Sequence, residues 1–188
     1  MKAISGLLLL ALGSTATLLP TAGDQTALIK GYRGWKLATT KPQDMTPQLA
    51  LSCAMQSKWN SPPNPHVPRV FVVYVNKAGE KAMLDTRAKS YPDDTVIVKE
   101  KYIRSQVSRK DEPYSTSVDP AKLKKAKPEL VTVMVKRDGK WEYFAIGNDG
   151  KLIKGDTKHC QSCHLANKEN DFVFRPYVTG AAQPRYRR

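Results

Sequence analysis

Hydrophobic and polar positions follow the pattern of β-strands in three stretches between residues 69 and 146. Two of them, RVFVVYVN (69–76) and TVIVKEKYI (95–103), are rich in the β-branched and aromatic residues that favour strands. In the third, LVTVMVKRDGKWEYFAI (130–146), two such runs flank Asp138-Gly139, a dipeptide that supplies the positive φ angles of a tight hairpin turn. The pattern predicts an α+β fold that is mainly antiparallel β-sheet with a few short helices.

Two other segments predict short helices. In TPQLALSCAMQSKW (46–59) the apolar spacing is helical and Thr46-Pro47 is a typical start, and the Pro-rich NSPPNPHVP (60–68) ends the helix. The polar segment 105–128 predicts a long loop with one short helix at 121–126. A chain of 188 residues is long enough for one domain with a hydrophobic core.

The N-terminus has the order of a secretory signal peptide. Lys2 precedes an apolar run over residues 3–19, and small residues follow up to Gly23. We therefore expect a cleaved signal peptide over 1–23 and a mature domain over 24–188 that is periplasmic or otherwise exported. The apolar run is too short for a stable membrane anchor.

The charge of the chain narrows the classes of partner. The formal net charge is +14 at pH 7, which favours anionic partners. The basic residues are spread along the chain, and the sequence has no recognisable nucleic-acid-binding module. We therefore expect no nucleic acid as a partner. An acidic redox partner is the remaining candidate.

The candidate chemistry lies in KHCQSCHLANKENDFVF (158–174). Residues at i, i+3 and i+4 share one face of a helix, so Cys160, Cys163 and His164 would project together. This arrangement fits one covalent haem c, whose vinyl groups form thioethers with the two thiols while the imidazole of His164 binds the iron as the proximal ligand.

Three other chemistries use the same residue types. A zinc site needs a fourth ligand, for which His159 or Cys53 is the obvious donor. A thioredoxin-like dithiol normally has most of its α/β domain downstream, but only 24 residues follow His164. A structural disulfide would leave His164 unexplained. Haem attachment accounts for all three residues, and Cys53 is then expected to be a buried thiol rather than a disulfide between subunits.

The late position of the motif bears on the sixth iron ligand. No Met or His follows His164, so a sixth ligand would come from upstream. An iron with an open distal position binds small ligands or performs chemistry, whereas a six-coordinate iron mainly transfers electrons. The upstream candidates are Met45, Met55, Met83, Met134, His66, His159 and Lys99.

Five pieces of the chain, in this order, resemble the cytochrome P-460 family, which includes the cytochromes c′-β: YRGW (32–35), PHVPRVFVVYVN (65–76), YPDDTVIVKE (91–100), GKWEYFAI (139–146) and CQSCHLANKENDFVF (160–174). The resemblance implies a single, mainly antiparallel β domain, usually a homodimer, with one haem c and an open distal face. Members called cytochrome P-460 oxidise hydroxylamine and carry a bond from a lysine to the haem ring. The cytochromes c′-β lack that activity and bind nitric oxide or related small ligands.

The cross-linking lysine lies in a segment that matches TVIVKE, which places it at Lys99. In a regular strand Val96, Val98, Glu100 and Tyr102 share one face, and Ile97, Lys99, Lys101 and Ile103 share the other. One ionic side chain of the Lys99/Glu100 pair therefore points to each side, and burying either is costly unless it is paired or modified. Without the resemblance, Lys99 would be interpreted as a solvated lysine of an edge strand. We expect an oxidoreductase acting on hydroxylamine or nitric oxide, with non-catalytic ligand binding and six-coordinate electron transfer as the alternatives.

The distal residues cannot be located by motif. A catalytic member needs a base that accepts protons from the substrate, for which Glu142, Glu100 and Asp149 are candidates. Glu142 is equally well the solvent-facing member of its hairpin. A binding-only member needs an apolar cap over the iron, and the candidates are Phe71, Val73, Phe144 and Tyr143.

Residues after the motif suggest further contacts with the haem. Phe172 and Phe174 share one side of an extended segment and are expected to pack on the ring. Asp171 is expected to hold this loop or to orient His164. Arg175 pairs with a haem propionate or faces solvent.

Overall fold

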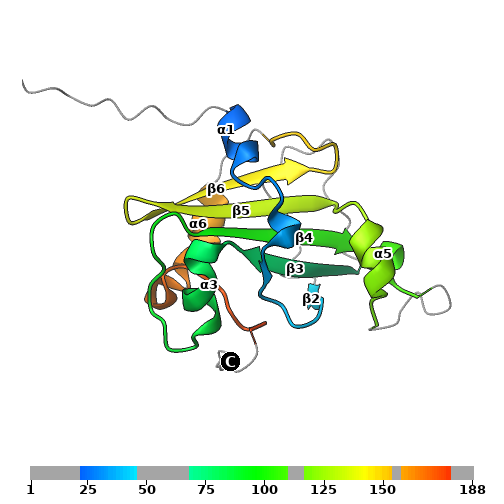
Figure 1. The fold of residues 1–188 in the computed structure, drawn as a ribbon, viewed down its shortest axis with the longest axis horizontal. Helices are drawn as coiled ribbons and strands as arrows, with labels where there is room; N and C mark the ends of the chain where they lie inside the picture. Colours follow the sequence, from blue (N-terminus) through cyan, green and yellow to red (C-terminus); the bar gives the residue numbers. More distant parts are fainter. Residues whose placement is uncertain (1–21, 46–67, 110–116, 154–157, 179–188) are drawn as a thin grey trace, which may run out of the picture.

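The computed structural model describes residues 22–45, 68–109, 117–153 and 158–178, and its centre is an antiparallel sheet of six strands (Figure 1). The strand order is β1-β3-β4-β5-β6, and β2 also pairs with β3. The strands are β1 (Lys36–Leu37), β2 (Gln43–Met45), β3 (Arg69–Val75), β4 (Val96–Ile103), β5 (Leu130–Arg137) and β6 (Lys140–Gly147). The predicted fold class is confirmed, and the four long strands are those that the sequence pattern predicts.

Short helices surround the sheet. They are α1 (Ala22–Ala27), η1 (Tyr32–Gly34), α3 (Lys77–Leu84), α4 (Arg104–Val107), α5 (Pro120–Lys125), α6 (Lys158–Leu165) and η2 (Lys168–Asn170). Helix α5 confirms the helix predicted at 121–126, whereas the helix predicted at 46–59 lies outside the described residues. Within the described ranges, no helix has the length and apolarity needed to cross a membrane.

Helix α3 is absent from the sequence-based prediction, although its start carries a recognisable signal. Asn76 caps the helix, and its side-chain oxygen accepts a hydrogen bond from the backbone N–H of Gly79. Asn is a preferred residue at this position because it satisfies a backbone donor that has no partner inside the helix. The Asn76 signal therefore marks a helix that the weak apolar spacing of KAGEKAML does not reveal.

The β5–β6 hairpin has the predicted turn. Asp138 and Gly139 have φ angles of 48° and 72°, the left-handed values that this tight turn requires. The turn fixes the register, in which Met134 pairs with Tyr143 and Val135 with Glu142. Because side chains alternate along a strand, Tyr143 and Glu142 point to opposite faces of the sheet.

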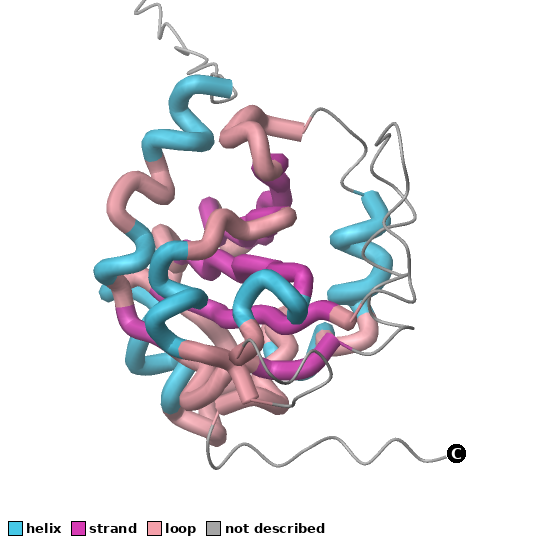
Figure 2. The backbone as a smooth tube through the Cα atoms, turned by 90° about the vertical axis from the view of Figure 1, so that its right-hand side faces the viewer, coloured by secondary structure: helices cyan, strands magenta, loops and turns pink. Residues whose placement is uncertain are grey.

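Side chains on both faces of the sheet are buried. The edge-on view shows helices on either side of the strands (Figure 2). We call one the α6 face, because Cys160 of α6 packs against its cluster, and the other the η1 face, because Tyr32 of η1 packs against it. The α6-face cluster comprises Ala38, Met45, Phe71, Val73, Val75, Met83, Tyr91, Ile97, Met134, Trp141, Tyr143, Val173 and Val178. The η1 face carries buried apolar side chains of β3 to β6, among them Val70, Val72, Val98, Val133 and Phe144.

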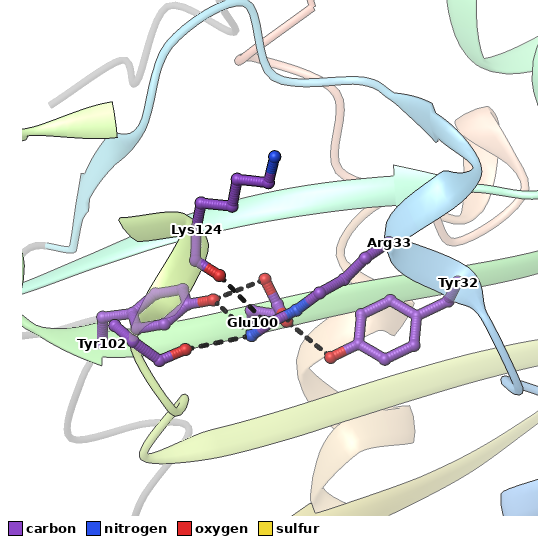
Figure 3. Close-up of polar contacts among 6 residues, drawn as sticks. Tyr32, Arg33, Glu100, Tyr102 and Lys124 are labelled. Carbon is purple, nitrogen blue, oxygen red and sulfur yellow. Dashed lines mark hydrogen bonds and ion pairs between the residues drawn. The ribbon is translucent and has the colours of Figure 1, made fainter. Parts of the chain in front are cut away.

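A buried carboxylate organises the η1 face. Glu100 has no exposed surface, and its two oxygens accept hydrogen bonds from Tyr32 Oη (2.5 Å), Arg33 Nε (2.7 Å) and Tyr102 Oη (2.6 Å) (Figure 3). Arg33 also donates to the carbonyl of Ala126 just after α5 (3.2 Å). The expectation that a buried Glu100 needs partners is therefore confirmed, and these partners tie η1 and α5 to the sheet.

The raised pKa values of the tyrosines in this cluster predict that the protein loses stability at alkaline pH. Burial and then the Glu100 carboxylate raise the pKa of Tyr74 to about 12, and burial first and the hydrogen bond to Glu100 second raise the pKa of Tyr32 and of Tyr102 further. In the unfolded chain these phenols ionise near pH 10, so their neutral forms stabilise the folded protein fully below about pH 10. As pH rises from about 10 to about 12, the unfolded chain loses these protons while the folded protein keeps them, and stability falls.

Denaturant titrations of the purified protein at a series of alkaline pH values test this expectation. The free energy of unfolding should fall across that window, and Tyr74→Phe should reduce the slope. A free energy that does not change with pH over the window would contradict the account.

Candidate functional site

The residues CQSCH lie on helix α6, as the sequence predicts. Cys163 and His164 lie three and four positions after Cys160, so the three residues share one side of the helix. Cys160 packs against the α6-face cluster, and both cysteines are partly buried thiols rather than a disulfide. The two thiols and the imidazole are thus presented together next to the α6 face.

The imidazole of His164 is held in one orientation. Its Nδ1 lies 2.6 Å from the backbone carbonyl oxygen of Phe172. A carbonyl only accepts hydrogen bonds, so Nδ1 carries the proton and Nε2 keeps its lone pair. A metal-binding histidine is commonly held in this way, because the bond at one ring nitrogen fixes the tautomer and raises the basicity of the other.

Burial favours the neutral form of this imidazole, and two aromatic rings lie against it. The ring centroid of Tyr143 lies 5.2 Å from that of His164, and the ring of Phe174 lies at 5.1 Å in an edge-on arrangement. Burial lowers the pKa of His164, the bond to Phe172 opposes this, and the positive charge of Lys99 lowers it further. A neutral imidazole with a lone pair on Nε2 is the form that binds iron.

The carbonyl of Phe172 is aimed by an unusual backbone. Asp171 and Phe172 have φ angles of 54° and 63°, in the left-handed region. The prediction of an extended segment is therefore wrong here, because two successive left-handed residues turn the chain back towards α6. Phe172 packs against the α6-face cluster, and Phe174 contacts the His164 ring. Packing of the two side chains on the haem stays a prediction.

The carboxylate of Asp171 holds this bend. It accepts hydrogen bonds from the backbone N–H of Tyr91 (2.7 Å), from Lys136 Nζ (2.5 Å) and from Trp141 Nε1 (3.2 Å). Of the two roles expected for Asp171, the structure shows that of holding the loop. The group bonded to His164 is the Phe172 carbonyl, which the sequence analysis missed.

Lys99 lies on the α6 face, as the two-residue period predicts. It pairs with Val73 on one side and Thr132 on the other, and its Nζ lies 4.6 Å from the centroid of the Phe71 ring. The interpretation as a solvated edge lysine is wrong, because β4 has a neighbouring strand on both sides and Lys99 is partly buried. Its charge also acts on His164, so the structure brings Lys99 and His164 to the same region.

The three carboxylates proposed as distal bases do not reach this region. Glu100 lies within the cluster on the η1 face. Glu142 points to the η1 face and lies 3.6 Å from Arg137. Asp149 is exposed after β6 and accepts a hydrogen bond from the backbone N–H of Lys151. None of these three carboxylates is therefore placed beside Lys99 and His164.

The other candidates are divided between the two faces. Phe71, Val73 and Tyr143 lie on the α6 face, whereas Phe144 lies on the η1 face and is not placed to cap the same site. The methionines Met45, Met83 and Met134 are buried in the α6-face cluster. Cys53, Met55 and His66 lie outside the described residues, as does the side chain of His159.

Arg175 has a different set of partners from those expected. Its guanidinium donates hydrogen bonds to the backbone carbonyls of Ala82 (2.9 Å), Asp85 (2.7 Å) and Ala88 (2.7 Å), at the end of α3 and in the loop after it. The solvent-facing alternative is wrong because Arg175 is buried. Pairing with a propionate stays a prediction, which these three bonds disfavour.

The donor set fits a haem better than a bare metal ion. Over the ranges that the structure describes, no group of three or more His, Cys, Asp or Glu side chains is placed to hold a metal ion. Two thiols and an oriented imidazole on one helix are the groups that would hold a haem here, and the adjacent aromatic side chains would offer it apolar surface.

The placement of the two glutamates predicts different effects of substitution. Glu100→Gln should destabilise the protein by roughly 2 kcal/mol, because it leaves buried donors without a full set of acceptors. Glu142→Gln is the matched control and should change stability by no more than about 0.5 kcal/mol, because its side chain is 44% exposed. Urea denaturation measures both. Equal effects, or an altered haem spectrum in either variant, would contradict this placement.

Comparison with known proteins identifies the family. The model of the family described as Cytochrome P460 matches residues 29–175, which is most of the chain and includes Lys99, Cys160, Cys163 and His164. Among curated proteins, none matches the chain. The chain therefore belongs to the cytochrome P460 family and is a haem protein.

Proposed function

We propose that the protein holds one haem c through thioethers to Cys160 and Cys163, with His164 Nε2 as the proximal iron ligand. The observation that carries this proposal is the 2.6 Å contact between His164 Nδ1 and the Phe172 carbonyl, which leaves Nε2 able to bind a metal. When bound, the haem supplies a redox-active iron with an open position for a small molecule.

We infer that the activity is oxidation of hydroxylamine or a related small nitrogen compound. The support is the position of Lys99, which lies on the face that carries α6 and within electrostatic reach of His164. In this proposal Lys99 Nζ forms a bond to a carbon of the haem ring. One N–H and one ring C–H are replaced by one C–N bond, and a peroxide or dioxygen oxidant accepts the two electrons and two protons.

The cross-link would also resolve the electrostatics of Lys99. Among the described residues, the contact found for this partly buried ammonium is a cation–π contact with the Phe71 ring, which offsets part of its lost hydration. Joining Nζ to the ring removes the need to keep a full positive charge at this place. The neighbouring ionic residue, Glu100, is stabilised differently: its buried carboxylate accepts hydrogen bonds from Arg33 and Tyr102.

Binding of nitric oxide without turnover is the second candidate. It is favoured by the apolar character of the surface around Lys99, where Phe71 and Val73 lie, and by the distance of Glu100 and Glu142 from that face of the sheet. A neutral diatomic ligand needs no base, whereas hydroxylamine must lose protons as it is oxidised.

The proposed setting of the protein follows from its charge and from its N-terminus. We propose an exported homodimer that passes electrons to an acidic redox partner. Export is supported by the signal-peptide order of residues 1–23, and the homodimer by the resemblance to the cytochrome P-460 family. The acidic partner is supported by the formal charge, which is +14 for the full chain and +13 without Lys2.

The state of Lys99 distinguishes the two candidates. In the unmodified holoprotein we expect an intact mass lower by two hydrogen atoms than the sum of the mature chain and one haem added through thioethers. Lys99→Arg should restore that sum and give an ordinary c-type ferrous spectrum. The control is Lys101→Arg, since Lys101 lies two residues along the same face of β4 and its replacement leaves Lys99 in place.

Hydroxylamine turnover with an artificial electron acceptor is then measured on the same three proteins. The enzyme proposal expects turnover in the unmodified protein and in Lys101→Arg, and its loss in Lys99→Arg. An ordinary c-type spectrum that Lys99→Arg does not change would refute the cross-link. Absence of turnover in cross-linked protein would favour the binding role, and a low-spin ferric spectrum typical of Met/His ligation would contradict both.

A further inference from the structure

A nearly buried ion pair lies between β5 and the loop that follows α6. The Nζ of Lys136 is 2.5 Å from Oδ2 of Asp171, and the two side chains are 9% and 11% exposed. The same carboxylate accepts hydrogen bonds from Tyr91 N and Trp141 Nε1, and Lys136 Nζ lies 5.8 Å from the centroid of the Trp141 ring. Asp171 is thus fixed to three separate parts of the chain.

The fixed residue is the first of the two left-handed residues that precede the His164 contact. A left-handed backbone is unfavourable for residues other than glycine, and more so for a bulky residue such as Phe172. Surrounding bonds must therefore hold it, and here they are the three bonds to the Asp171 carboxylate and the bond from Phe172 N to the Asn167 carbonyl (2.8 Å). The carbonyl of Phe172 then meets His164 Nδ1.

We propose that Lys136 and Asp171 are positioning residues for the proximal imidazole. The ion pair holds the left-handed bend, the bend aims the Phe172 carbonyl, and the carbonyl sets how strongly the Nδ1–H of His164 is bound. A stronger bond at Nδ1 makes the imidazole a better electron donor through Nε2, which strengthens the bond to the iron and lowers the reduction potential. This inference rests on the proposed role of His164 as the iron ligand.

A direct effect of charge on the haem is the competing explanation, and the pair allows the two to be separated. Removing the negative charge of Asp171 and removing the positive charge of Lys136 change the electrostatic potential at the haem in opposite directions. Releasing the bend acts in the same direction in both cases, because each substitution breaks the same ion pair. A measurement that reports the iron–histidine bond itself therefore tests the geometry.

The experiment compares ferrous holoproteins by resonance Raman spectroscopy, with the iron–histidine stretching band as the readout. Asp171→Asn and Lys136→Met should both lower the frequency of this band. Glu129→Gln is the matched control, because Glu129 forms a similar ion pair with Arg69. The two atoms are 2.6 Å apart, and the side chains of Glu129 and Arg69 are 17% and 5% exposed. This pair joins the start of β3 to the segment before β5, away from the bend. Glu129→Gln should lower stability without moving the band.

The results that would overturn the inference are distinct. If both variants unfold at lower denaturant concentration but keep the band of the unmodified protein, the ion pair only stabilises the fold. If the two bands move in opposite directions, charge alone is acting. If the unmodified ferrous protein shows no iron–histidine band, the iron is not five-coordinate with His164 as its ligand, and both the proposed open site and this inference fail.

Discussion

Side chains alternate along β4, so the adjacent residues Lys99 and Glu100 point to opposite faces of the sheet. Both faces of this sheet are covered by other parts of the chain. Two ionic side chains in the middle of a central strand must each find a partner in the interior. On the η1 face, Tyr32, Arg33 and Tyr102 enclose the Glu100 carboxylate. On the α6 face, Lys99 lies over the Phe71 ring in the region where His164 is presented. The chemistry that we propose uses the α6 face, where the contact described for Lys99 Nζ is with an aromatic ring.

The proposed proximal side is built by contacts between parts of the chain that are distant in the sequence. Helix α6 supplies His164, but the orientation of its ring comes from Phe172, eight residues later. The position of Phe172 depends in turn on Asp171, which β5 and β6 hold through Lys136 and Trp141. The sheet therefore acts on the imidazole although no strand residue is hydrogen-bonded to it among the contacts described.

Local patterns predict the parts of this structure whose causes are local. The long strands follow from runs of β-branched and aromatic residues, the hairpin from Asp138-Gly139, and the separation of Lys99 from Glu100 from the period of a strand. The helical spacing of Cys160, Cys163 and His164 follows from their positions alone.

The parts that the sequence does not predict depend on distant partners. Nothing local favours a left-handed Phe172, since a bulky residue avoids that region unless tertiary contacts hold it. The carbonyl partners of Arg175 are about 90 residues earlier in the chain, and this separation hides them from any local pattern. The Asn76 cap is the exception, because it is a local signal for α3 that could have been used.

Covalent attachment of the haem to α6 is the central claim, and one measurement tests it directly. The holoprotein is denatured in acidified organic solvent, digested with trypsin, and analysed by mass spectrometry. The account predicts that the haem remains on the peptide HCQSCHLANK (159–168), bound through Cys160 and Cys163. Release of free haem, with both cysteines recovered as thiols, would contradict it.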